Sequence, residues 1–276
     1  MNTGRPPGPL SLNTATTRGQ WGLAEAIDGC VRHGITGISP WRDQLEALGV
    51  GEGARRIKAS GLTVTGLCRG GMFTAADAAG RAAACDDNRR AVDEALEIGA
   101  RCLVLVVGGL PPGSRDMVAA RAQVRDGIAE LLEYARPQGM PIAIEPLHPM
   151  YAADRACINT LAQANDLCEQ LGAGLGVAVD VYHVWWDPCL AVEIARAGRR
   201  VLGFHICDWL VPTTDLLLDR GMMGDGVIDI PAIRAMIEAA GYDGFCEVEI
   251  FSAANWWKRD PDEVLRTCIE RHRTVV

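Results

Sequence analysis

The sequence predicts an α/β fold in which a single domain, residues 1–276, forms a (β/α)8 TIM barrel. Short apolar runs alternate with amphipathic helical segments eight times along the chain. Strands joined by crossover helices form a parallel sheet, and eight such units in about 275 residues match a closed barrel. No internal linker or low-complexity segment interrupts the alternation.

A doubly wound open sheet is the competing architecture. Such a fold carries a glycine-rich phosphate loop after its first strand. Here the corresponding region, residues 13–19, reads NTATTRG and has no such loop. The sequence therefore favours the closed barrel.

The predicted strands are short and mostly apolar, which is typical of strands buried on both faces. The clearest is Gly174–Val179, a run with no helical spacing of its apolar residues, which ends in Asp180. The others are Leu10–Thr14, Ile35–Ser39, Leu62–Cys68, Cys102–Val107, Pro141–Glu145, Val201–Ile206 and Phe245–Ile250.

The predicted helices lie between these strands. Trp21–His33 has one apolar face and ends at Gly34, a typical helix stop. Asp229 is expected to cap a helix that has Pro231 in its first turn and ends at Gly241. A further helix follows the segment PWRDQ and runs through Ala47 and Gly51–Ser60, with a break near Gly49. The remaining helical segments are Ala75–Ile98, Asp116–Tyr134, Asn159–Leu171, Pro188–Ala197 and Asp260–His272.

Charge and hydropathy exclude some classes of partner. The net charge of −8 argues against nucleic acid, because phosphate binding usually needs a basic face. The longest apolar run, Cys102–Val107, is far too short to span a bilayer, and the first residues lack the apolar core of a signal peptide. The ten cysteines have no metal-binding spacing, so we expect them to be reduced in a cytoplasmic protein.

Potential metal ligands stand at the ends of the last four predicted strands, where a barrel places its functional groups. They are Glu145, Asp180, His205 and Glu249. Taken singly, a carboxylate or histidine at a strand end is more often structural, but four on successive strands would repel one another without a cation. Three oxygen donors and one imidazole suit one divalent metal ion, with Mn²⁺ the first choice and Co²⁺, Mg²⁺ or Zn²⁺ as alternatives.

The segments IAIEPLHP, VDVYH, FHICDW and EVEIF resemble the motifs of the xylose isomerase-like barrel family. That family holds sugar isomerases, ketose 3-epimerases, keto-inositol isomerases and dehydratases, and the endonuclease IV branch. The resemblance implies that the same four residues bind the metal, and that Glu145 and Glu249 are also opposed proton-transfer groups. Glu249 matches the last ligand better than Glu247, because it is followed by one residue and then Phe251.

Further residues are expected to bind the substrate. The resemblance implies that His183 contacts a substrate oxygen and that Arg220 also touches the substrate. The loop after Glu145 lacks the second glutamate that epimerases of the family place there, and His148 or Asp154 stands nearby instead. Most tryptophans follow predicted strands, which suits a carbohydrate ligand or contacts between subunits of a homo-oligomer. Substrate-binding candidates are therefore His183, Arg220, Trp185, His148, Arg69 and Trp41.

The leading hypothesis is a metal-dependent isomerase or epimerase acting on a keto-sugar or cyclitol-like substrate by proton transfer through a metal-stabilised enediolate. A lyase or dehydratase that eliminates from a keto-inositol or keto-glycoside through the same enolate is the first alternative, and a non-catalytic sugar-binding barrel the second. A nuclease of the endonuclease IV type is disfavoured, because it needs histidines after the third and fourth strands. Those positions read Cys68-Arg69-Gly70 and Val107-Gly108-Gly109.

Overall fold

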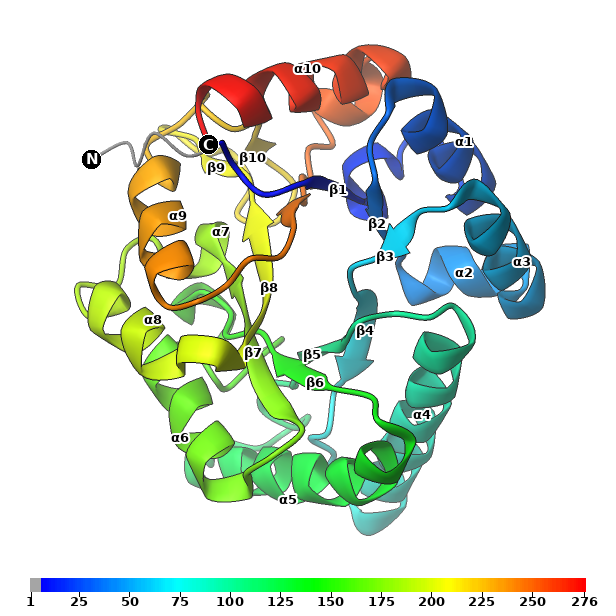
Figure 1. Cartoon of the computed structure of the whole chain (residues 1–276). Helices are drawn as coiled ribbons and strands as arrows, with labels where there is room; N and C mark the ends of the chain where they lie inside the picture. The colour runs from blue at the N-terminus through cyan, green and yellow to red at the C-terminus, as the bar shows by residue number, and fades with distance from the viewer. Residues whose placement is uncertain (1–5) are drawn as a thin grey trace.

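The structure, a computed structural model, describes residues 6–276 and is a barrel of strands inside a ring of helices (Figure 1). Nine strands form one parallel sheet in the order β3-β2-β1-β11-β8-β7-β6-β5-β4. The predicted TIM barrel is confirmed. The strands are β1 (Leu10–Asn13), β2 (Gly37–Ser39), β3 (Thr63–Val64), β4 (Leu67–Gly71), β5 (Leu103–Val106), β6 (Ile142–Ile144), β7 (Leu175–Asp180), β8 (Val201–Ile206) and β11 (Cys246–Val248).

The third predicted strand is interrupted, and the barrel closes across the interruption. It divides into β3 and β4, and β4 continues past the expected end to Gly71. The Thr65 amide donates to the Ile38 carbonyl at 2.9 Å, and the Cys68 amide donates to the Pro40 carbonyl at 3.0 Å. These bonds continue the pairing with β2 beyond the break, so β3 and β4 act as one barrel strand.

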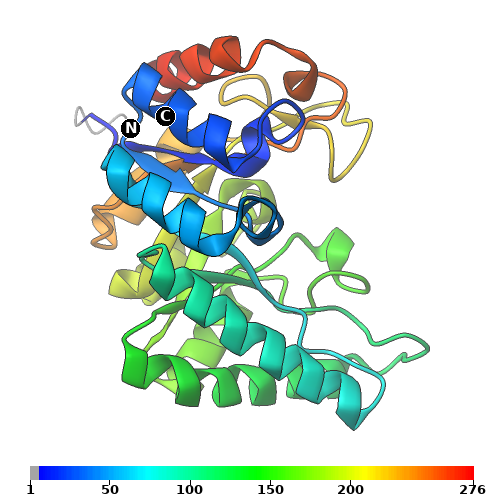
Figure 2. The same cartoon turned by 90° about the vertical axis from the view of Figure 1, so that its right-hand side faces the viewer.

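The helices follow the predicted order, including the break at Gly49. Figure 2 shows the barrel from the side, with the long loops of residues 145–160 and 207–227 extending from one end. Within residues 6–276, no helix is long and apolar enough to cross a membrane. The α-helices are α1 (Leu23–His33), α2 (Arg42–Leu48), α3 (Val50–Ser60), α4 (Ala78–Glu97), α5 (Met117–Ala135), α6 (Leu161–Leu171), α7 (Val181–Val184), α8 (Leu190–Ala197), α9 (Ile230–Ala239) and α10 (Pro261–Thr274).

Three local features differ from the sequence prediction. The first strand ends at Asn13 rather than Thr14, because the Asn13 side chain accepts a bond from the Ala15 amide and caps a short 3-10 helix. The helix α7 begins directly after β7, where no helix was predicted. The expected loop of residues 207–227 contains an antiparallel hairpin of β9 (Asp208–Trp209) and β10 (Arg220–Gly221).

Two apolar layers stabilise the barrel. The larger lies between the strands and the helices, and the smaller fills the barrel interior with Cys68, Cys102, Val104, Ala143 and Ala178. All ten cysteines are free, and all but Cys85 and Cys189 are buried.

The end of β4 is held in place by Asn88 of α4. Its side-chain oxygen accepts a bond from the Gly71 amide at 2.6 Å, and its amide donates to the Gly71 carbonyl at 2.7 Å. Gly71 has a φ of 109°, and a Cβ atom there would lie 2.0 Å from the Val106 carbonyl oxygen. The close approach of β4 and β5 therefore needs both the glycine and its asparagine clamp.

We expect Asn88→Ala to lower the free energy of unfolding by about 2–4 kcal/mol, because two buried backbone groups of Gly71 would lose their partner. Urea denaturation followed by circular dichroism measures this change. The matched control is Asn255→Ala, whose side chain bonds only to exposed Arg259 and should matter by no more than about 0.5 kcal/mol. Equal stability of both variants would contradict the clamp.

Candidate active site

The four predicted metal ligands come together at one end of the barrel. Glu145 follows β6, Asp180 ends β7, His205 lies in β8 and Glu249 follows β11. These four strands are consecutive neighbours in the sheet, so their ends meet on one side of the barrel mouth. One ligand atom from each residue lies within 4.8 Å of the others, and all four side chains are buried.

The imidazole of His205 is oriented by carboxylates at both ring nitrogens. Its Nδ1 lies 2.8 Å from Glu145 Oε1, inside the cluster, and its Nε2 lies 3.5 Å from Glu247 Oε1. A second carboxylate behind a ligating histidine is a common arrangement, because it fixes the ring and its tautomer. Nδ1 is therefore the atom of His205 that faces the other members of the cluster and would bind a metal ion held there.

Glu247 belongs to a buried polar network behind the cluster, which the sequence did not reveal. Thr65 Oγ1 donates to its Oε2 at 2.7 Å, and Asn13 Nδ2 donates to its Oε1 at 2.8 Å. Asn13 Nδ2 also lies 3.0 Å from Glu249 Oε1, so one amide holds both carboxylates. The feature of the sequence that could have indicated this role is Asn13, a polar residue near the end of the first predicted strand.

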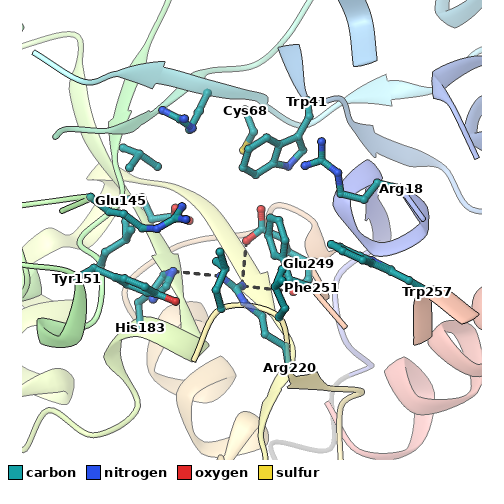
Figure 3. A pocket seen from close by; sticks show the side chains of 16 residues that line it. Arg18, Trp41, Cys68, Glu145, Tyr151, His183, Arg220, Glu249, Phe251 and Trp257 are labelled. Carbon is teal, nitrogen blue, oxygen red and sulfur yellow. Dashed lines mark hydrogen bonds and ion pairs between the residues drawn. The ribbon is translucent and has the colours of Figure 1, made fainter. Parts of the chain in front are cut away.

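Arg220 of β10 reaches into the cluster (Figure 3). Its Nη1 lies 2.9 Å from Asp180 Oδ2 and 3.1 Å from Glu249 Oε2. The guanidinium is sandwiched between the rings of Tyr182 and Phe251, at 4.4 and 4.9 Å from their centroids. The hairpin of β9 and β10 thus fixes a positive charge beside two candidate ligands.

Burial and charge shift the pKa values of the cluster. Burial raises the pKa of Glu249 to about 8, although Arg220 opposes this rise, and Glu145 adds to it. Burial alone would lower the pKa of His205, but Glu247 and Glu145 hold it well above its usual value. Burial lowers the pKa of His183 to about 3, so its neutral Nε2 can accept from Arg220 Nη2 at 3.3 Å.

The chemistry of the cluster fits a divalent cation. Three carboxylates and one imidazole are crowded within 4.8 Å in a buried site, where unneutralised like charges are costly. Oxygen donors with a single nitrogen suit Mn²⁺, Mg²⁺, Co²⁺ or Zn²⁺. The residues that would hold the ion are the four predicted ones.

A pocket of about 270 Å³ opens over the cluster, and it is lined by aromatic and positively charged side chains (Figure 3). Four of the predicted site residues that are not ligands line it, namely Trp41, Arg69, His183 and Arg220. Trp257, one of the tryptophans whose position after a predicted strand suits a carbohydrate ligand, also lines it. The sequence indicated no substrate role for the other lining residues, which are Arg18, Cys68, Val106, Leu147, Tyr151, Arg155, Leu217, Leu218 and Phe251.

Two predicted substrate residues, His148 and Trp185, are not part of the pocket lining. The His148 ring contacts Trp186 and Trp209, with ring centroids 5.5 and 5.2 Å away. Trp185 follows the short helix α7 and packs against Trp209 and the apolar core. Because α7 turns the chain directly after β7, these tryptophans cover the barrel beside the pocket rather than entering it.

The chain shares its fold and its sequence pattern with known proteins. Residues 27–268 match the family described as xylose isomerase-like TIM barrel. The chain belongs to this family. The resemblance seen in the strand-end motifs is thereby confirmed.

Two curated members of the xylose isomerase-like family are similar to part of the chain. Inosose isomerase of Halalkalibacterium halodurans is 24% identical over 154 residues, which are 54% of this chain and 52% of that protein. Fructoselysine 3-epimerase of Escherichia coli O157:H7 is 26% identical over 161 residues, 56% of this chain and 53% of that protein. The matched segment thus spans about half the length of each curated relative.

Solved structures of the family superpose over nearly the whole chain. The protein SMc04130 of Sinorhizobium meliloti 1021 is 66% identical, with a TM-score of 0.95 and coverage of 96% of this chain and 98% of that one. The IOLI protein, solved with a binding zinc atom, has a TM-score of 0.84 at 21% identity, with coverage of 97% and 98%. The second likeness concerns the fold alone.

Proposed function

We propose that this protein is a divalent-metal-dependent isomerase or epimerase that moves a proton next to the carbonyl of a keto-sugar or cyclitol-like substrate. The observation that carries the proposal is the position of Glu145 and Glu249. Both are members of the buried four-residue cluster, and both line the same pocket. The names of the curated relatives, an isomerase and an epimerase of small polyols or sugars, support this class of reaction.

The two glutamates enter the pocket from different strand ends. Two strands, β7 and β8, separate β6 from β11 in the sheet, so Glu145 and Glu249 approach a bound molecule from different directions. One carboxylate can take a proton from a carbon next to the carbonyl, and the other can return it on the opposite face. A divalent ion held by the cluster would supply Lewis-acid stabilisation of the negative charge that develops on the substrate oxygens.

Other residues orient the substrate and fix the proton-transfer groups. Arg220 holds Asp180 and Glu249 at 2.9 and 3.1 Å, and its guanidinium faces the pocket. The neutral His183 lines the same pocket and suits a contact with a substrate hydroxyl. Rings of Trp41 and Trp257 provide apolar faces of the kind that pack against the C–H groups of a sugar.

The test is solvent exchange in a panel of candidate substrates. Protein loaded with Mn²⁺ is incubated in D₂O with ketoses, keto-inositols and keto-glycosides, and NMR detects deuterium next to the carbonyl. We expect exchange with at least one compound, its loss after chelation, and its return on reloading. A rearranged product indicates isomerase or epimerase activity, and loss of water or an alcohol indicates the lyase alternative. No exchange with Mn²⁺, Co²⁺, Mg²⁺ or Zn²⁺ would contradict the proposal and favour a non-catalytic barrel.

A further inference from the structure

Arg69 is a pocket residue that forms no ion pair within the part of the chain that the structure describes, residues 6–276. It lies in β4, is half-buried and lines the pocket over the cluster. Within residues 6–276 its guanidinium makes no ion pair and no side-chain hydrogen bond. Partial burial of an arginine costs hydration free energy of its guanidinium group, and hydrogen bonds to a carboxylate or another acceptor normally offset this cost.

A second arginine, Arg155, lines the same pocket, and its guanidinium lies over the ring of Tyr151, 5.6 Å from the centroid. Its Nε lies 4.0 Å from Asp154 Oδ2, and that aspartate side chain is 68% exposed. Such a distant, solvated ion pair contributes little. Burial and then the charge of Arg155 lower the pKa of the Arg69 guanidinium, which indicates that the two positive groups are close.

The other arginines near this end of the barrel are already engaged. Arg42 forms bonds with Asp87 and Glu94, Arg18 pairs with Asp43, and Arg220 pairs with two members of the cluster. The chain has 35 acidic residues against 27 basic ones, so acidic partners are abundant. Among the four arginines that line this pocket, Arg69 and Arg155 are therefore the two that have no carboxylate oxygen closer than 4.0 Å within residues 6–276.

We propose that Arg69 and Arg155 bind an anionic group, a carboxylate or a phosphate, on the substrate whose reacting carbon faces Glu145 and Glu249. This inference rests on the proposed function for the reaction and adds the charge of the substrate. Guanidinium groups present forked donors that match the oxygens of either anion. An anion between the two arginines would also relieve their mutual repulsion. Because both arginines and both glutamates line one pocket, a single small molecule can contact all four.

The test compares three ketoses that differ in charge: D-fructose, D-fructuronate and D-fructose 6-phosphate. Their dissociation constants from the Mn²⁺-loaded protein are measured by calorimetry, and deuterium exchange is followed in parallel. We expect at least one anionic ketose to bind about 10-fold or more tightly than fructose. The preferred anion distinguishes a carboxylate from a phosphate ligand.

Variants assign the preference to residues. Arg69→Met and Arg155→Met should each weaken binding of the preferred anion about 10- to 100-fold, as loss of a charge-assisted hydrogen bond does, and should weaken it more than they weaken binding of fructose. The control is Arg115→Met, which removes the same charge from an exposed arginine that lines no pocket described here. Circular dichroism checks each variant. If Arg69→Met does not fold, Arg155→Met tests the proposal in its place, because Arg155 is half-exposed.

The outcomes separate this inference from the proposed function. Equal binding of the three ketoses, no binding of either anion, or an equal loss in Arg115→Met would overturn the anionic site. Arginine-dependent binding without deuterium exchange would support the site and contradict the proposed reaction. Exchange on neutral ketoses without any preference for anions would contradict only the inference made here.

Discussion

Glu249→Gln should reduce turnover about 10³-fold while the protein stays folded, because the amide keeps the shape of the carboxylate but cannot take a proton. The side chain is buried and accepts bonds from Asn13 and Arg220, so a glutamine keeps its volume and one of these two bonds, and circular dichroism checks that the variant is folded. The measurement is kcat on the substrate found in the exchange panel, at saturating Mn²⁺. Deuterium exchange should fall with it, because the same group handles the proton.

The matched control for this variant is Glu247→Gln, two residues earlier on the same strand face. Glu247 is equally buried, but it contacts His205, Thr65 and Asn13 and does not line the pocket. Loss of a carboxylate behind a metal ligand usually weakens metal affinity about 10- to 100-fold. Excess Mn²⁺ should therefore restore much of the activity of Glu247→Gln but none of that of Glu249→Gln. Full activity of Glu249→Gln would contradict its role in proton transfer.

The sequence could predict the fold and the ligand set because both depend on local order along the chain. Each strand reads as an apolar run, and parallel strands place their ends at one mouth of a barrel. Residues directly after a strand, such as Glu145 and Glu249, therefore converge independently of the conformation of the loops. The position of each group at the end of its strand is therefore enough to predict that these groups lie close together.

The pocket wall could not be predicted in the same way, because loops build it. Arg155 lies in the long loop after β6, and its position depends on packing of that loop against its neighbours. His148 and Trp185 stand further beyond the ends of β6 and β7 than Glu145 and Asp180 do, and the turn of α7 and the contacts with Trp209 place them outside the lining. Arg220 was inferred from family resemblance, and no local pattern indicated the hairpin that positions it.

Substitution of a single metal-binding residue of the cluster should abolish stable metal binding. Asp180 is fully buried and accepts a bond from the Tyr182 amide, while its second oxygen faces Arg220. Asp180→Asn keeps the shape and the helix cap but removes the charge that a divalent ion needs. We expect its metal affinity to fall at least about 100-fold, the upper range seen for residues that only support a ligand. Glu145→Ala should have the same effect.

Mass spectrometry of the dialysed proteins measures this difference, with about one divalent ion per chain expected in the wild type. Thermal denaturation gives a second readout, since an ion at 100 times its dissociation constant stabilises a protein by about 2.7 kcal/mol. Asp208→Asn is the control, because Asp208 is also buried at this end but holds the amides of Gly224, Gly226 and Ile228 outside the cluster. It should lose stability and retain the ion. A wild-type protein that binds no ion after loading with Mn²⁺, Co²⁺, Mg²⁺ or Zn²⁺ would leave the carboxylates of the cluster to Arg220 and His205 and remove the basis for the proposed reaction.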